Sequence, residues 1–195
     1  MNFSNIILNW YAINGRELPW RQTTDPYAIW LSEVIMQQTK IAQGTAYWER
    51  FIKRWPNVQS LANATEDEVL REWQGLGYYS RARNLHKAAQ QIVDLGYFPQ
   101  TYNELIQLKG IGEYIAAAVY SIAFAGPVAV VDGNVYRVLA RFFGIEIPID
   151  STQGKKIFKA IAQDNLPKNA PAAYNQGIMD FGAMQCTPTL PNCKV

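Results

Sequence analysis

Apolar residues recur at intervals of three and four along most of the chain, which predicts a protein built from helices. The first such pattern predicts a helix over about 3–13 that ends at Gly15, followed by an extended connector over 18–21. Asp25 and Pro26 are typical of a helix start, and the helix they open continues through Glu33 to about Gln38. This segment is apolar nearly all round, so we expect it to lie buried at the centre of the fold.

Further helix starts are predicted by two capping boxes, Thr65 with Glu68 and Thr101 with Glu104. Together with the apolar periodicity they predict helices over about 41–54, 65–73, 78–95, 101–108, 113–124, 134–143, 152–163 and 171–183. A short extended segment is expected over 128–131. No alternating pattern is long enough for a sheet, so the predicted fold class is all-α.

Composition narrows the possible functions. The chain has 195 residues, of which 49% are hydrophobic, enough for a full core that could be split into two lobes. A net charge of only +2 excludes a general polycation, so any nucleic-acid contact must be a local patch. The sequence has no membrane-span pattern and no signal-like segment, and the expected location is cytoplasmic, with association to the nucleoid.

Two carboxylates stand in strongly apolar surroundings. Glu33 is the only formally charged residue between Pro26 and Thr39, and Asp132 is the only one between Tyr114 and Tyr136. Burying an unpaired carboxylate costs several kcal/mol or raises its pKa. We therefore expect both groups to serve the chemistry of the protein.

A glycine-rich turn, residues 108–112, joins two of the predicted helices. Gly110 and Gly112 would let the backbone approach a ligand closely and point N–H groups at a phosphate. By its spacing alone, this turn is equally compatible with an ordinary connection between helices.

Taken with its neighbours, the turn resembles the helix-hairpin-helix-Gly/Asp DNA glycosylases, and most broadly the MutY-type adenine glycosylases. The resemblance extends over nearly the whole chain, through segments 15–21, 25–27, 31–39, 75–85, 108–112, 130–134 and 182–186. It implies a two-lobed, endonuclease III-like fold. One lobe would be a six-helix barrel over 19–131 with the helix-hairpin-helix motif at about 101–124. Residues 1–18 and 132–195 would form a cluster-type domain, with the active-site cleft between the lobes.

The same resemblance implies the catalytic roles. Glu33 would protonate adenine and then help water to attack, while Asp132 stands as an anion beside the oxocarbenium-like sugar. Asn134 would assist at the sugar or phosphate; alone it would be read as a polar residue at a helix start. Tyr114 occupies the position at which endonuclease III-type enzymes carry a Schiff-base lysine, which implies an enzyme without strand cleavage. Tyr114 could instead pack or hydrogen-bond beside the catalytic carboxylates.

The resemblance also implies DNA contacts. Gln38 and Tyr78 would enter the duplex as the target base is flipped out, although alone they would be read as surface and core residues. Arg16 and Arg21 match arginines near the adenine pocket. Gly110 and Gly112 would contact a phosphate, and the family suggests a monovalent cation there.

A basic stretch contains Arg81, Arg83, His86 and Lys87. It suggests either a phosphate contact or an ordinary solvated face. The single histidine, His86, is given no chemical role.

Cys186 and Cys193 match the first half of a [4Fe–4S] signature in which four cysteines are spaced six, two and five residues apart. The third would fall just after Val195. The chain could end inside the motif, or the site could be lost; a disulfide or two idle thiols are the simpler interpretations. We expect no intact cluster in this chain, unless ligands come from elsewhere.

The predicted function is a monofunctional DNA glycosylase that removes adenine paired with 8-oxoguanine or guanine. The expected partner is double-stranded DNA, bound by a monomer. A DNA-binding fragment without turnover is the alternative from another class, and a glycosylase or lyase for a different base is the alternative within the class.

Overall fold

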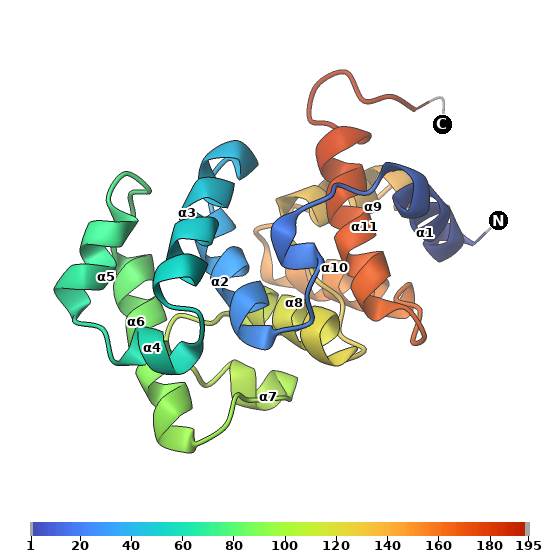
Figure 1. Ribbon diagram of the computed structural model, residues 1–195. Coiled ribbons are helices and arrows are strands. Elements are labelled where there is room, and N and C mark those ends of the chain that lie inside the picture. The colour runs from blue at the N-terminus through green and yellow to red at the C-terminus, as the bar shows by residue number, and fades with distance from the viewer. Residues whose placement is uncertain (1, 194–195) are drawn as a thin grey trace. The chain divides into compact units, whose positions relative to one another are not determined.

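The computed structural model describes residues 2–193, which form helices and loops without a strand (Figure 1). The elements are α1 (Phe3–Asn14), η1 (Pro19–Arg21), α2 (Pro26–Met36), α3 (Ile41–Arg54), α4 (Val58–Ala62), α5 (Glu66–Trp73), α6 (Ser80–Leu95), α7 (Tyr102–Leu105), α8 (Glu113–Phe124), α9 (Gly133–Phe143), α10 (Thr152–Asp164) and α11 (Pro171–Met184). The predicted all-α class is confirmed. Among the described residues, no helix has the length and apolarity needed to cross a membrane.

The chain folds as two compact units. The hairpin unit is Leu18–Phe124, and the terminal unit contains the residues up to Glu17 together with those from Ala125 onward. Residues 125–131, predicted to belong to the barrel, lie with the terminal unit. The reason is a pair of hydrogen bonds: the buried Asn175 amide accepts from Val130 N at 3.2 Å and donates to Val128 O at 2.9 Å.

The hairpin unit is built around α2. Asp25 caps this helix by accepting a hydrogen bond from the Tyr27 N–H at 3.0 Å, and Pro26 occupies the first helical position. Trp30 and Leu31 are fully buried, and the helix packs against α3, α6 and α8. The predicted burial of this apolar segment is confirmed, and it fixes the direction in which Glu33 leaves the helix.

Several helix boundaries differ from those expected. Helix α2 stops at Met36, α6 starts only at Ser80, and 18–21 contains a short 3₁₀ turn instead of an extended connector. Helix α4, which begins with a capping box between Asn57 and Ser60, was not predicted. Helix α4 has five residues, too few for an apolar periodicity to show.

The terminal unit brings the first and last helices of the described residues together. Helix α1 packs against α11, and α11 packs against α9, which also contacts α10. A Cβ atom added to Gly177 would lie 2.9 Å from Tyr11 Cβ, so α1 and α11 approach too closely there for any larger residue. Ile7 and Ile178 are buried in the same unit.

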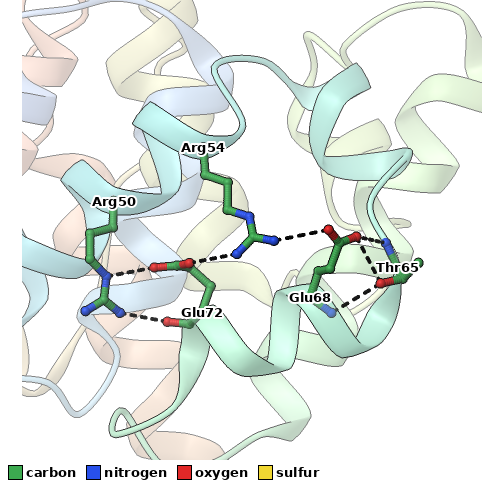
Figure 2. A network of polar contacts seen from close by, with 5 residues as sticks. All are labelled: Arg50, Arg54, Thr65, Glu68 and Glu72. Atoms are coloured by element: carbon green, nitrogen blue, oxygen red, sulfur yellow. Dashed lines mark hydrogen bonds and ion pairs between the residues drawn. The ribbon is translucent and has the colours of Figure 1, made fainter.

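The start of α5 carries a polar network that crosses to α3 (Figure 2). The Thr65 N–H donates to the Glu68 carboxylate at 2.9 Å, and Glu68 N donates back to the Thr65 hydroxyl. Arg54 donates to Glu68 and to Glu72, each at 3.1 Å. Hydrogen bonds from the Thr65 backbone and hydroxyl, with a smaller contribution from Arg54, lower the pKa of Glu68 below its ordinary value of 4.5.

The lowered pKa sets the pH at which this network stabilises the fold. Because the folded protein holds Glu68 ionised more strongly than the unfolded chain does, the stabilisation is complete above pH 4.5 and is lost as the pH falls through the lower, folded pKa. We therefore expect Glu68→Gln to lower the urea midpoint at pH 7 but to match the wild type at acidic pH. A midpoint difference that does not change with pH would contradict this. Thr65→Ala should lower the free energy of unfolding by about 1 kcal/mol.

Candidate active site

Glu33 and Tyr114 meet in the hairpin unit. Both side chains are half-buried, and the Tyr114 hydroxyl donates a hydrogen bond of 2.8 Å to Glu33 Oε2. Glu33 lies on α2 between the buried residues Ser32 and Val34, and Tyr114 is the second residue of α8. The packing of α2 against α8 thus brings a carboxyl group and a phenol into contact. A carboxyl group held in this way can exchange a proton with a bound molecule.

The glycine turn between α7 and α8 is anchored by apolar residues and presents its backbone outward. Leu108 and Ile111 are both buried. Gly110 has φ +78°, and a Cβ there would lie 2.6 Å from Asn84 Cβ, so this position requires glycine. A Cβ at Gly112 would meet nothing within 4 Å, and the backbone there faces open space.

Gln38 and Tyr78 both have a left-handed backbone, with φ angles of +53° and +45°. This conformation is uncommon for residues other than glycine and is unfavourable. Gln38 is exposed just after the end of α2, and Tyr78 is 67% exposed before α6. Without the family resemblance, Tyr78 would be predicted to lie in the core. Its exposure shows that this prediction is wrong.

The basic stretch does not form one charged face. Arg81 turns inward, where its guanidinium donates to carbonyl oxygens at the end of α2 and to Leu76 O. His86 is 4% exposed, and its Nε2 has no hydrogen-bond partner. Arg83 is exposed and bonds Glu66 at 3.3 Å, and Lys87 is exposed. Only two of the four predicted basic residues therefore remain on the surface.

Asp132 caps α9 in the terminal unit. Its Oδ1 accepts a hydrogen bond of 2.8 Å from Val135 N, and its Oδ2 accepts one of 3.0 Å from Asn134 Nδ2. The carboxylate is half-buried. Because Asn175 holds the preceding residues, the position of Asp132 is fixed from both sides. A capping role and an electrostatic role are compatible, since the cap uses only part of the carboxylate's capacity to accept hydrogen bonds.

The structure adds Arg137, which was not among the predicted site residues. Arg137 donates to Asn134 Oδ1 at 2.7 Å and to Gly182 O at 2.6 Å, and its Nε donates to Cys186 O at 2.7 Å. It thereby joins the Asp132 motif to the loop after α11. Its contact with Asn134 is local to the motif, whereas the sequence carried no signal for the two contacts with residues 182 and 186.

The two predicted adenine-pocket arginines lie in different units. Arg16 belongs to the terminal unit, where its backbone N–H and its guanidinium both bond the fully buried carboxylate of Asp180. A fully buried carboxylate requires such a partner. Arg21 is half-buried at the end of η1 in the hairpin unit.

Cys186 and Cys193 are both free thiols, and they line one cavity of about 320 Å³ together with Phe3 and Phe181. Arg141 lies 3.4 Å from Cys186 Sγ. Among residues 2–193, no group of three or more histidine, cysteine or acidic side chains is arranged to hold a metal. Two cysteines supply half of a four-cysteine set, so the residues described do not by themselves fit a [4Fe–4S] cluster.

The helical fold and the glycine turn between α7 and α8 define a helix-hairpin-helix protein. The chain belongs to the HhH-GPD superfamily of base excision DNA repair proteins, whose family model matches residues 31–167. The adenine DNA glycosylase of Buchnera aphidicola subsp. Acyrthosiphon pisum is 39% identical over 99% of this chain. The adenine DNA glycosylase of Homo sapiens is 40% identical over 98% of this chain. The chain spans 56% and 37% of the lengths of these relatives.

Solved structures agree with the fold. A thermostable thymine-DNA glycosylase superposes with a TM-score of 0.90 at 27% identity, covering 98% of this chain and 89% of that one. An endonuclease III–DNA complex superposes with a TM-score of 0.81 at 22% identity, covering 97% and 87%. The predicted endonuclease III-like helical fold is thus confirmed.

Proposed function

We propose that this chain is a monofunctional DNA glycosylase that removes adenine paired with 8-oxoguanine or guanine. The observation that carries the proposal is the contact between Glu33 and Tyr114. Glu33 can donate a proton to adenine, and the residue beside it is a tyrosine at the position where the resemblance implies that a lyase would carry a lysine. The similarity to adenine DNA glycosylases over nearly the whole chain supports adenine as the base.

The proposed reaction assigns unequal roles to the two carboxylates. Glu33 donates a proton to adenine, so that the C1′–N9 bond breaks with its electron pair leaving on a neutral base. Asp132 stays ionised and stabilises the positive charge that develops on the sugar. Water then adds to C1′ and returns a proton to Glu33. Asn134 holds Asp132 in place through its amide, since its Nδ2 donates to the aspartate.

Gln38 and Tyr78 are proposed to enter the duplex as adenine is flipped out, because both are exposed on turns with an uncommon backbone. The open backbone at Gly112 is proposed to contact a phosphate, with a monovalent cation as the family resemblance suggests. Arg16 and Arg21 are proposed to border the adenine pocket. The protein is proposed to act as a monomer on DNA in the cytoplasm.

One assay tests the function directly. The chain is incubated with duplexes that contain adenine opposite 8-oxoguanine, guanine or thymine. Heat and alkali then cleave the DNA at each abasic site, so the amount of cleaved strand measures base release. We expect release opposite 8-oxoguanine and guanine but not opposite thymine. Binding without release would favour the fragment alternative. Because a thymine-DNA glycosylase shares this fold, a thymine–guanine duplex is included, and release of thymine alone would favour the other-base alternative.

Tyr114 leads to a prediction about strand cleavage. A phenol cannot form a Schiff base with the sugar, so borohydride should trap no covalent adduct between the wild-type chain and the DNA. Tyr114→Lys should yield a trapped adduct, because it places an amine next to Glu33. Both proteins are compared on denaturing gels. Strand cleavage by the wild type at the rate of base release would contradict the monofunctional assignment.

A further inference from the structure

One side chain, that of Arg81, forms hydrogen bonds with both the Gln38 turn, residues 37–39, and the loop that carries Tyr78. The Tyr78 loop, residues 74–78, has each of its carbonyls occupied by a hydrogen bond. Donors are Tyr47 to Gln74 O, Gln43 to Gly75 O, Arg81 Nη2 to Leu76 O, Trp73 Nε1 to Gly77 O, and Arg81 N to Tyr78 O. Arg81 supplies two of these bonds. A backbone so fully bonded can maintain the left-handed φ of Tyr78.

The same guanidinium also holds the other turn. Arg81 Nη1 donates to Val34 O at 3.0 Å, to Ile35 O at 3.2 Å and to Gln37 O. Because α2 ends at Met36, these carbonyls lie in its last turn and just beyond, where the helix supplies no donor of its own. A cation at this end also complements the helix dipole. The Gln38 turn and the Tyr78 loop therefore share one side chain.

Aromatic packing fixes the guanidinium further. Its central carbon lies 5.0 Å from the ring centroid of the fully buried Trp73 and 5.8 Å from that of Tyr78. Burial lowers the pKa of Arg81, as expected for a cation taken partly out of water. Arg81 also lines, with Gln37 and Gly110, a small cavity of about 90 Å³, so the glycine hairpin adjoins the same residue.

A phosphate-binding role for Arg81 does not fit this arrangement. Both terminal nitrogens already donate to carbonyl oxygens, and Nε is buried. The side chain thus acts on the protein backbone, whereas exposed Arg83 remains available to solvent.

We propose that Arg81 is a positioning residue that couples the Gln38 turn to the Tyr78 loop, so that both side chains enter a duplex together. The proposal rests on the proposed function, in which these two residues replace the flipped base. Lysine cannot take the place of Arg81, because a single ammonium does not present the planar fork of donors that spans both segments.

The first test is hydrogen exchange of the free protein, which does not depend on activity. In Arg81→Met, amides of residues 37–39 and 75–79 should exchange about tenfold faster or more, both segments together, because several charge-assisted hydrogen bonds are lost. The matched control is Arg54→Met, which removes a guanidinium that also bonds two acceptors and lies 4.8 Å from the Trp55 ring. It should leave both segments unchanged. Unchanged exchange in Arg81→Met, or a change in one segment only, would overturn the proposal.

The second test follows base flipping with 2-aminopurine in place of the target adenine. Arg81→Met and Arg81→Lys should bind duplex but show about a tenfold smaller fluorescence rise, at a temperature well below their melting points. Combining Arg81→Met with Tyr78→Ser should lose no more than the larger single effect, since both act on one step. The coupling would be overturned if the double variant lost the product of the two single losses in fluorescence rise, or if Arg81→Met flipped the base as fully as the wild type. A wild type that neither flips nor releases base would instead refute the proposed function, and hydrogen exchange would still decide the role of Arg81.

Discussion

Glu33→Gln is expected to slow adenine release by about 10²- to 10⁴-fold, the range found when a general acid is removed. Glutamine has nearly the same shape, and its amide oxygen can still accept the hydrogen bond from Tyr114, which is 2.8 Å long in the wild type. The variant therefore loses the transferable proton while it keeps the contact between α2 and α8. Single-turnover base release on the adenine–8-oxoguanine duplex measures the effect.

Glu49→Gln provides the control, because Glu49 is exposed on α3 in the same unit. It should release adenine at the wild-type rate. Duplex affinity and the melting temperature of Glu33→Gln should also stay close to wild type. If Glu33→Gln keeps more than a tenth of the wild-type rate, Glu33 is not the general acid.

Asp132→Asn is expected to slow the same reaction by about 10²- to 10³-fold through the loss of a fixed charge beside the sugar. Asparagine caps helices about as well as aspartate, so α9 should keep its start and the protein its stability. Asp132→Ala removes the cap as well and should lower the free energy of unfolding by a further ~1 kcal/mol. Comparing the two variants separates the charge from the cap.

The measurements are single-turnover rates together with urea unfolding of both variants. Asp150→Asn is the matched control, since Asp150 is an exposed aspartate of the terminal unit. A normal rate in Asp132→Asn combined with a slow, unstable Asp132→Ala would mean that Asp132 serves only as a cap.

Much of this fold could be predicted because the signals are local. A capping box such as Thr65 with Glu68 specifies a helix start within four residues, and the structure contains both of its hydrogen bonds. Gly110 could be identified because a left-handed turn and a close approach to another helix both require glycine. The apolar α2 segment could be assigned to the core because none of its faces is polar enough to meet water.

The roles of the arginines could not be predicted in this way. Arg81 and Arg83 are two residues apart in one basic stretch, yet one is turned into the protein and the other is exposed. What separates them is the end of α2, forty-odd residues earlier in the chain, whose free carbonyls attract a donor. Arg137 likewise depends on distant carbonyls, that of Gly182 in α11 and that of Cys186 in the loop after it. Contacts of this kind become visible only when distant segments are seen together.

The packing of α1 against α11 has a consequence for biosynthesis. Helix α1 is synthesised before the hairpin unit, but its partner α11 begins only at Pro171, after that unit. Ile7 and Trp10, which are buried in the finished protein, must therefore stay exposed to water while the hairpin unit is made and folds. Closing so long a loop is slow, because chain entropy opposes contacts between distant residues. A chaperone that holds nascent apolar helices would accordingly act on α1 until α11 has been made.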